Sequence, residues 1–143
     1  MSVLEKLNYD TFEAALARSR DLEKDIQKQP EKYKVLTGDR PTGRLHIGHL
    51  FGSLQNRVRL HKLGVPTYIV IADYQVLTDR DTFDNIAENI IQLTIDYIAA
   101  GIDPHNGKTF IFPHSHVPEL NQLLLPFLTL VTNAELDRNP TVK

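Results

Sequence analysis

The sequence predicts an α/β fold with a parallel sheet and flanking helices, preceded by a separate N-terminal helix. Short β-favouring segments alternate along the chain with longer segments whose apolar residues recur at helical spacing. The order is helix, then β-α-β-α-β-α, which is typical of parallel sheets built with right-handed crossovers. The 143 residues are enough for one domain of this kind to bury its own core.

The composition narrows the class of protein. The chain is 41% hydrophobic and 24% charged, has a net charge of -2 and contains no cysteine, which excludes a disulfide framework. No apolar run reaches the ~18 residues that a membrane span needs, and the first residues lack the apolar stretch of a signal peptide. We therefore expect a cytoplasmic protein without a membrane partner. A dedicated nucleic-acid-binding domain is usually basic, so any contact with RNA must be local or lie elsewhere.

Residues 1–30 predict a helical extension. Asp10 followed by Glu13 resembles a capping box and would start the helix at Asp10. Pro30 closes the segment. The extension is either a lid or interface element, or a helix packed on the outside of the domain. Its apolar residues at helical spacing are Phe12, Ala15, Leu16, Leu22 and Ile26.

The first β-α-β unit follows. Residues 33–37 predict a strand that Gly38 ends, and residues 46–63 predict a helix with Gly64 as its left-handed cap. Residues 67–72, TYIVIA, are mostly apolar, as in a strand buried on both faces. The expected apolar stripe of the helix is Ile47, Leu50, Phe51, Leu54 and Val58.

The second half continues the alternation. Residues 82–100 predict a helix that Gly101 stops, and residues 109–112 predict a third strand. Pro118 suits the first position of a helix over 119–132, in which Pro126 predicts a kink or break. That helix is apolar nearly all round, which predicts burial. The apolar stripe of the helix over 82–100 is Phe83, Ile86, Ile90, Leu93 and Tyr97, and the apolar residues of the last helix are Leu123, Leu124, Leu125, Phe127, Leu128, Leu130 and Val131.

Ligands of such sheets bind beyond the carboxyl ends of the strands. The loops at 38–45, 73–81 and 113–117 are therefore expected at one edge, where a site would form.

The strongest functional motif is the run His-Ile-Gly-His from His46 to His49. It opens a helix, whose N-terminus offers unpaired backbone N–H groups and the positive end of the helix dipole, a ready site for phosphate. The two imidazoles add donors, and charge if protonated. Gly48 lets a flat base or ribose approach the backbone, and Arg40 and Arg44 can reach a polyphosphate.

Other interpretations of this motif stay open. Two histidines three apart could ligate a metal, but no cysteine or nearby carboxylate completes a tetrahedral set, so no metal site is predicted. They could also cap the helix or lie on the surface without a role. The loop before them matches neither the Walker A pattern nor G-x-G-x-x-G. There is no serine or cysteine nucleophile motif, so we expect no covalent intermediate.

Four segments together resemble one family. They look like class I aminoacyl-tRNA synthetases, and within them the tryptophanyl type: the run TGDRPTGRLHIGHLFGSLQNRVRLH, which contains the motif, IADYQVLTD at 71–79, SHVPELNQL at 115–123 and LDRNPTVK at 136–143. The resemblance covers residues 33–143 and leaves out the N-terminal helix. It implies that residues 31–143 form the first half of a Rossmann-like catalytic domain, the nucleotide-binding fold of that class.

The resemblance also implies a reaction and its residues. The carboxylate of tryptophan attacks the α-phosphate of ATP, supplied with Mg²⁺, pyrophosphate leaves, and the aminoacyl group passes to tRNA(Trp). The catalytic residues implied are His46 and His49; the ATP contacts are Arg40, Pro41, Thr42, Gly48 and His49; and the tryptophan pocket is lined by Leu36, Gly38, Asp73, Tyr74 and Gln75.

The chain departs from the family pattern at two of these positions. The family often carries Gln where this chain has Arg40, and often His where it has Gln75, which hydrogen-bonds but cannot be charged. No KMSKS-type lysine loop occurs in the 143 residues. We therefore expect a truncated chain, without that loop and the anticodon-binding domain, that folds but adenylates poorly by itself.

In this family the last helix lies near a subunit interface, which implies a homodimer for the intact enzyme. Three alternatives stay open: a tyrosyl-tRNA synthetase, a His-x-Gly-His nucleotidylyltransferase, and a non-catalytic nucleotide-binding paralogue.

Overall fold

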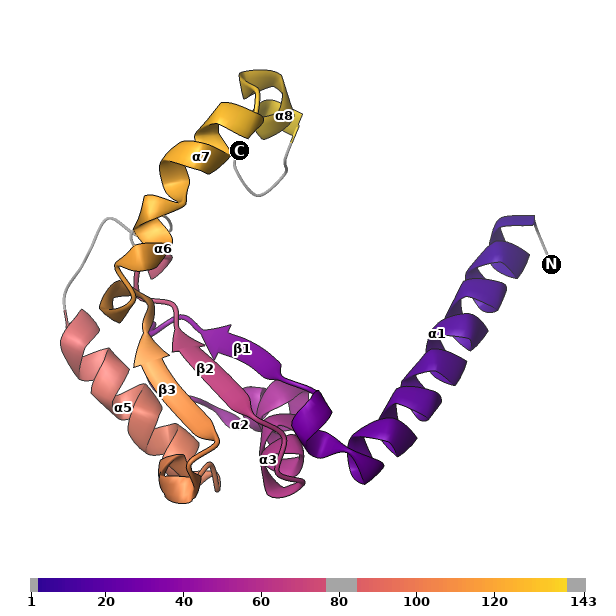
Figure 1. Cartoon of the computed structure of the whole chain (residues 1–143), viewed down its shortest axis with the longest axis horizontal. Helices are drawn as coiled ribbons and strands as arrows, with labels where there is room; N and C mark the ends of the chain where they lie inside the picture. The colour runs from indigo at the N-terminus through magenta and orange to yellow at the C-terminus, as the bar shows by residue number, and fades with distance from the viewer. Residues whose placement is uncertain (1–2, 77–84, 139–143) are drawn as a thin grey trace.

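A parallel sheet lies at the centre of the molecule, seen here in a computed structural model that describes residues 3–76 and 85–138. Its strands are β1 (Val35–Asp39), β2 (Thr67–Ile71) and β3 (Thr109–Pro113), in the order β1-β2-β3 (Figure 1). Both pairings are parallel, and Val35, Thr67 and Thr109 stand in register. The predicted α/β fold with a parallel sheet and flanking helices is confirmed.

The first strand differs from its predicted bounds. It begins at Val35 and runs through Gly38 to Asp39. Gly38 does not end it, because the strands approach closely there: a Cβ on Gly38 would lie 2.2 Å from the carbonyl oxygen of Val70. The glycine therefore permits the pairing of β1 with β2 and is not a stop signal.

One face of the sheet carries the core. On β2 the side chains of Thr67, Ile69 and Ile71 are buried, whereas Tyr68 and Val70 on the other face are partly exposed. The prediction of a strand buried on both faces is therefore right for one face only, because the described helices pack on that face. The core cluster consists of Leu54, Ile69, Ile71, Leu93, Tyr97 and Ile102.

The helix after the first loop is continuous but not uniform. It comprises α2 (Ile47–His49), a π-helical turn (Leu50–Leu54) and α3 (Gln55–Lys62), and Gly64 ends it at φ +83° as predicted. Leu54 is buried, but Ile47 and Phe51 are 70% and 64% exposed. A π turn contains more residues per turn than an α-helix, so it rotates the first turn away from the predicted apolar stripe.

Helix α5 (Ile86–Ala99) covers the same face of the sheet and supplies much of the core. Leu93 and Tyr97 are fully buried, and Gly101 at φ +109° ends the helical segment as predicted. The predicted start of this helix, residues 82–84, lies outside the described residues. A short 3-10 helix (Pro104–Asn106) leads from α5 to β3.

The N-terminal helix is longer and less packed than predicted. Helix α1 (Val3–Lys28) begins well before Asp10, so Asp10 is not its N-cap. A short 3-10 helix (Pro30–Lys32) follows it, and α1 leads away from the sheet (Figure 1). Phe12 and Leu22 are 61% and 45% exposed. The rest of the domain contacts α1 near the C-terminal end of the helix, where Arg59 of α3 pairs with Glu23. Packing on the outside of the domain is therefore limited to that end.

The C-terminal segment forms an arm. A 3-10 turn (His114–His116) is followed by α6 (Glu119–Gln122), α7 (Leu124–Leu130) and α8 (Asn133–Arg138), which lead away from the sheet (Figure 1). The predicted break occurs at Leu123, since Pro126 has no N–H for the carbonyl four residues before it. Pro118 is the cap before α6, not its first residue.

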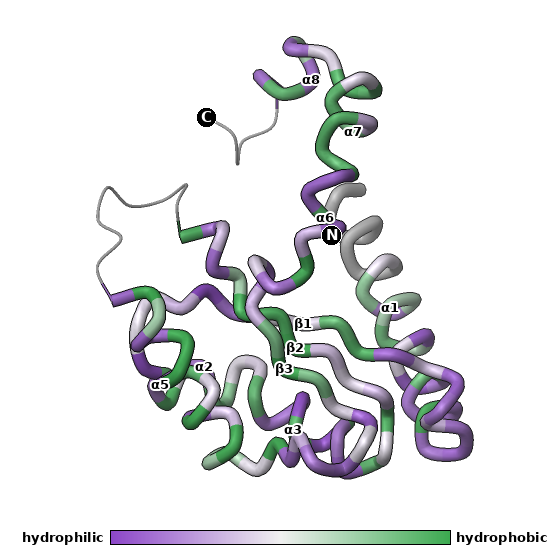
Figure 2. Tube along the Cα trace, turned by 60° about the vertical axis from the view of Figure 1, so that its left-hand side comes forward, coloured by the Kyte–Doolittle hydropathy of each residue, from purple (hydrophilic) through white to green (hydrophobic). Residues whose placement is uncertain are grey.

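The apolar residues of the arm are exposed, against the prediction of burial. Their exposed fractions range from 37% at Leu136 to 76% at Leu130, and Figure 2 shows α7 as a mostly hydrophobic segment away from the sheet. A helix that is apolar nearly all round normally lies in a core, but the apolar side chains of this one stay exposed to solvent. Within the described residues, no helix combines the length and the apolar character needed to cross a membrane.

Candidate functional site at the carboxyl edge of the sheet

The loops after the three strands meet at one edge, as predicted for their described residues. The backbone N–H of Ala72, just after β2, donates to the carbonyl of Asp39 at the end of β1, at 2.9 Å. The backbone N–H of Ser115, just after β3, donates to the Asp73 carboxylate at 3.1 Å. Residues 77–81 of the second loop lie outside the described part of the chain.

The His-Ile-Gly-His run forms a reciprocal cap. The Nδ1 atom of His46 accepts the backbone N–H of Gly48 at 3.1 Å, and the Nδ1 atom of His49 accepts the backbone N–H of His46 at 3.2 Å. The two ring centroids lie 4.0 Å apart. An imidazole nitrogen that accepts a hydrogen bond carries no proton, so both neutral rings hold their proton on Nε2.

This arrangement corrects one part of the sequence interpretation. Two of the first backbone donors of the helix are not unpaired, because the two imidazoles already bind them. A protonated ring would lose its acceptor and with it the cap. The donors that the turn keeps for a ligand are therefore the Nε2–H groups of His46 and His49.

Gly48 is required by the His46 ring. A Cβ at Gly48 would lie 2.8 Å from Cε1 and 3.0 Å from Nδ1 of His46, too close for the ring to keep its cap. Gly52, one turn further along, has open space where a Cβ would stand. The structure thus gives Gly48 a steric role beside the predicted approach of a base or ribose.

The loop between β1 and the cap is anchored by a buried proline. Pro41 is among the fully buried side chains, whereas Arg40 and Thr42 on either side are exposed. The backbone N–H of Thr42 donates to the carbonyl of Arg40 at 2.8 Å. Gly43 adopts φ +132°, a conformation that favours glycine. The loop therefore presents two polar side chains over a fixed turn.

A buried polar cluster at the start of this loop was missed by the sequence analysis. Arg57 of α3 binds both oxygens of the Asp39 carboxylate, and the hydroxyl of Tyr97 donates to the same carboxylate at 2.6 Å. Burial would raise the pKa of Asp39, but the hydrogen bonds from Arg57 and Tyr97 outweigh it, and the pKa is lowered. An arginine one turn after buried Leu54 was the available signal of an internal ion pair.

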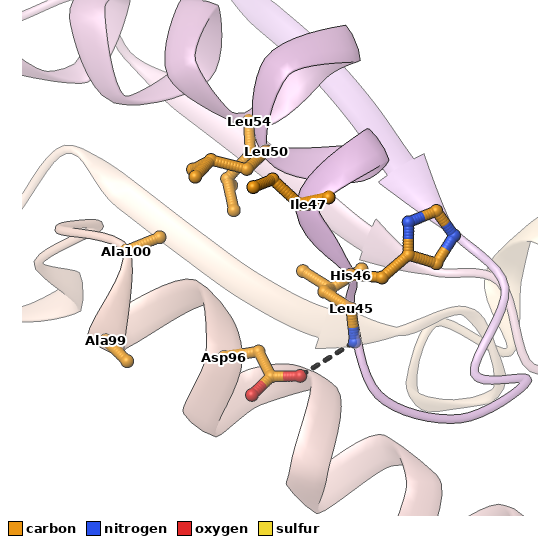
Figure 3. A pocket seen from close by; sticks show the side chains of 8 residues that line it. All are labelled: Leu45, His46, Ile47, Leu50, Leu54, Asp96, Ala99 and Ala100. Atoms are coloured by element: carbon orange, nitrogen blue, oxygen red, sulfur yellow. Dashed lines mark hydrogen bonds between the residues drawn. The ribbon is translucent and has the colours of Figure 1, made fainter.

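A second acid, Asp96 of α5, binds the end of the loop and was also missed. Its carboxylate accepts the backbone N–H of Leu45 at 2.8 Å (Figure 3). The same carboxylate pairs with Arg44 at 3.4 Å. In Figure 3 the His46 ring points away from α5. An open pocket of about 410 Å³ lies between α5 and the start of the helical segment that begins with α2. The pocket is lined by Leu45, His46, Ile47, Leu50, Leu54, Asp96, Ala99 and Ala100.

The residues predicted to line the amino-acid pocket fall into two groups. Asp73 is 7% exposed, and its carboxylate accepts hydrogen bonds from Tyr74 and from both the backbone and the hydroxyl of Ser115. Gln75 follows in the same turn and is exposed. Leu36 and Gly38 lie on the outward face of β1, where Leu36 is 74% exposed. The structure thus brings Asp73, Tyr74 and Gln75 together at the carboxyl edge and places Leu36 and Gly38 on the open face of the sheet.

His114 adds a further polar group beside Tyr74. The two ring centroids lie 5.0 Å apart, and the Asn121 amide donates to the Tyr74 hydroxyl at 3.3 Å. The Nδ1 atom of His114 is buried and has no hydrogen-bond partner within the described part of the chain. In that same part, no three His, Cys, Asp or Glu residues are grouped so that they could hold a metal ion.

Comparison with known protein families identifies one match over most of the chain. The family described as tRNA synthetases class I (W and Y) matches residues 28–143. The tryptophan–tRNA ligase of Clostridium longisporum is 51% identical over 111 residues, which cover 76% of this chain and 32% of that protein. The corresponding ligase of Streptococcus agalactiae is 49% identical over 112 residues, with the same two coverages. The chain thus spans about a third of the length of these relatives.

Solved structures give the same result. Tryptophanyl-tRNA synthetase from Campylobacter jejuni superposes with a TM-score of 0.67 at 27% identity, over 76% of this chain and 33% of that chain. A second structure of the Campylobacter jejuni protein, described as complexed with ADP and tryptophan, gives a TM-score of 0.65 at 27% identity, over 74% of this chain and 32% of that one. The sheet and helices described above are therefore the Rossmann-like fold of these enzymes, with α1 in front of it.

Proposed function

The chain belongs to the class I tRNA synthetases of the tryptophan and tyrosine (W and Y) family, and on that premise we propose that it carries the ATP-binding half of a tryptophan–tRNA ligase. Residues 31–143 would form the first half of the catalytic domain, with residues 1–30 as a helical extension. The observation that carries the proposal is the reciprocal cap of His46 and His49, which uses Nδ1 of both rings and leaves their Nε2–H groups as donors at the start of a helix beside the ligand edge of the sheet.

The reaction proposed is the activation of tryptophan followed by its transfer to tRNA(Trp). A carboxylate oxygen of tryptophan attacks the α-phosphorus of ATP, and the bond to pyrophosphate breaks. The 3′-terminal ribose hydroxyl of the tRNA then attacks the carbonyl carbon, and AMP leaves. Chemistry of this kind depends on positioning and charge stabilisation more than on acid–base groups. Mg²⁺ would enter as part of the ATP complex, held by phosphate oxygens.

The nucleotide side of the site would use the cap and the loop. The Nε2–H groups of His46 and His49 donate to phosphate oxygens of ATP, which a neutral imidazole does without losing its own cap. Arg40 and Thr42 lie exposed on either side of Pro41, where they can reach the polyphosphate. Because Gly48 has no Cβ, it leaves room for the His46 ring and for the nucleotide.

The tryptophan side would be built around Tyr74 and Gln75. Asp73 is fully engaged with Ser115 and Tyr74, so its role is to fix the turn and not to bind the substrate directly. Leu36 and Gly38 offer an apolar surface for the indole on the outward face of β1. The His114 ring packs on Tyr74 and completes the polar border of this pocket.

Two measurements test the proposal. Tryptophan should raise the melting temperature of the chain, and a rise with tyrosine alone would contradict the assignment. In the protein that carries this chain, His49→Ala should lower ATP–pyrophosphate exchange by about a hundredfold, the scale of losing one preorganised donor. The matched control is His105→Ala, an exposed histidine on the 3-10 helix before β3. Equal exchange rates in the two variants would favour a non-catalytic nucleotide-binding protein.

The exposed arm supports the proposed assembly. The apolar residues of α7 are too exposed for a segment that functions alone in water. We propose that they form a subunit contact in a homodimer that works in the cytoplasm with ATP, tryptophan and tRNA(Trp).

A further inference from the structure

We propose that Asp96, on a helix that offers no side chain to the predicted site, is a positioning residue for ATP. Together with its neighbour Tyr97, Asp96 ties α5 to both ends of the loop at residues 40–45. The inference rests on the function proposed above and adds to it a control of the nucleotide loop by α5.

The start of the loop is fixed by Tyr97. Its hydroxyl donates to the Asp39 carboxylate at 2.6 Å, and Asp39 is the last residue of β1 before Arg40. Tyr97 is fully buried in the core, so this end of the loop moves only if the core moves. Arg57 holds the other side of the same carboxylate.

The end of the loop is fixed by Asp96. One carboxylate oxygen accepts the backbone N–H of Leu45 at 2.8 Å, immediately before the His46 cap, and the other lies 3.4 Å from the Arg44 guanidinium. The Asp96 side chain is 17% exposed and that of Arg44 is 70% exposed. The backbone contact is therefore the stronger of the two, since exposed ion pairs contribute little.

The position of Leu45 sets the direction of the helix start. Leu45 is joined directly to His46, and both the backbone N–H and the ring of His46 take part in the cap. Beside this contact lies an open, mostly apolar pocket, with Ala99 and Ala100 of α5 on one side and Leu50 and Leu54 on the other (Figure 3). Without the Asp96 oxygen, the loop end can shift into that space and carry the imidazoles with it.

The tryptophan side should be insensitive to this change. Asp73 is held by Ser115 after β3, and Tyr74 by Asp73 and Asn121. None of these contacts passes through Asp96. Loss of the Asp96 carboxylate should therefore weaken ATP binding and leave tryptophan binding as it was, which a general loss of stability would not do.

The test compares Asp96→Ala and Asp96→Asn with the control Glu88→Gln. Glu88 lies on the same helix and accepts a hydrogen bond only from Gln92 among the described contacts. Calorimetry gives the dissociation constants of this chain for ATP and for tryptophan, and hydrogen exchange gives the protection of the Leu45 and Gly48 amides. We expect Asp96→Ala to weaken ATP binding about tenfold, and Asp96→Asn, which keeps an acceptor oxygen, to weaken it less.

The outcomes are separable. An unchanged affinity for ATP in Asp96→Ala, or equal losses for ATP and tryptophan, overturns the inference while the proposed function stands. If the unmodified chain binds neither compound, the proposed function fails, and the inference is decided by exchange alone. Faster exchange confined to Leu45 and Gly48 in Asp96→Ala then supports only the anchoring of the loop by Asp96, while its role toward ATP falls with the proposed function; unchanged protection of both amides overturns the anchoring as well.

Discussion

At the scale of single residues, each histidine of the cap uses one ring nitrogen for the helix, and in the proposed function it uses the other for the nucleotide. Nδ1 of each ring accepts a backbone N–H, and the Nε2–H group remains free to act as a donor. The motif therefore couples helix initiation to ligand binding: whatever displaces a ring also frees a backbone donor. Gly48 is the residue whose side chain would disturb this arrangement first.

The glycines of this helix give a matched test. Gly48→Ala should lower the free energy of unfolding by about 1 kcal/mol, the value of a helix N-cap, because the new Cβ collides with the His46 ring. Gly52→Ala should be neutral or stabilise by up to about 1 kcal/mol, since alanine favours helix and meets nothing there. Chemical denaturation measures both. Equal effects of the two substitutions would contradict the steric role of Gly48.

The Asp39 cluster predicts a dependence of stability on pH. The pKa of Asp39 is lowered below its ordinary value of 3.8. The stabilisation is therefore complete above the pKa of the unfolded chain and is lost as pH falls through the lower folded value. We expect the free energy of unfolding to fall below about pH 4, and to fall less steeply in Asp39→Asn, as measured by denaturation at a series of pH values.

Two substitutions in this cluster should lower the free energy of unfolding by different amounts at neutral pH. Asp39→Asn leaves the buried Arg57 without its counter-charge and should cost about 3 to 5 kcal/mol. Tyr97→Phe removes one hydrogen bond and keeps the ion pair, and should cost about 1 kcal/mol. A larger loss in Tyr97→Phe would show that the hydroxyl, and not the ion pair, secures the start of the loop.

At the scale of elements, α5 is the helix on which both the core and the loop depend. Leu93 and Tyr97 anchor it in the core cluster, while Asp96 and Tyr97 reach the loop ends. One helix thus transmits the packing of the sheet to the nucleotide turn. Helix α1 has no comparable role among the described contacts, since it meets the body only near its C-terminal end.

The break between α6 and α7 tests the effect of a single proline. Pro126→Ala restores a backbone N–H in the first turn of α7, so α6 and α7 should join into one helix and the helical signal in circular dichroism should rise. Pro118→Ala is the control, because that proline precedes α6 and interrupts no hydrogen bond within it. Backbone chemical shifts that keep Leu123 outside the helix in Pro126→Ala would place the cause of the break elsewhere.

At the scale of the whole molecule, apolar surface remains uncovered at two places that matter for association. One is α7, and the other is the outward face of the sheet, where Tyr68 and Phe110 stack with ring centroids 5.2 Å apart and Leu36 stands exposed beside them. Parallel sheets are normally covered on both faces. Apolar area of this kind favours association.

Self-association is therefore expected to depend on the arm. Leu125→Glu places a charge at a residue of α7 that is 73% exposed and should shift the chain toward monomer in sedimentation velocity over a range of concentrations. Gln122→Glu adds the same charge at an exposed polar position of α6 and should leave the association as it was. Equal sedimentation of both variants and the unmodified chain would exclude α7 as the contact.

Local signals in the sequence determined most of the fold. Alternation of strand and helix patterns gave the parallel sheet, Gly64 and Gly101 gave two helix ends, and Pro126 gave the break. Each depends on the backbone preferences of a residue and its near neighbours, which are readable without a partner. The His-Ile-Gly-His run at a helix start was visible for the same reason.

Only the tertiary structure decided how that motif is held. The Nδ1 caps of His46 and His49 are local, but the contacts that fix the loop around them are not. That Gly38 is a point of close strand contact, and that Asp39 and Asp96 anchor the loop, depend on atoms far apart in the sequence. Asp96 and Leu45 are separated by 51 positions, and no periodicity or local preference encodes such a hydrogen bond, because it exists only once the core has brought the helix and the loop together.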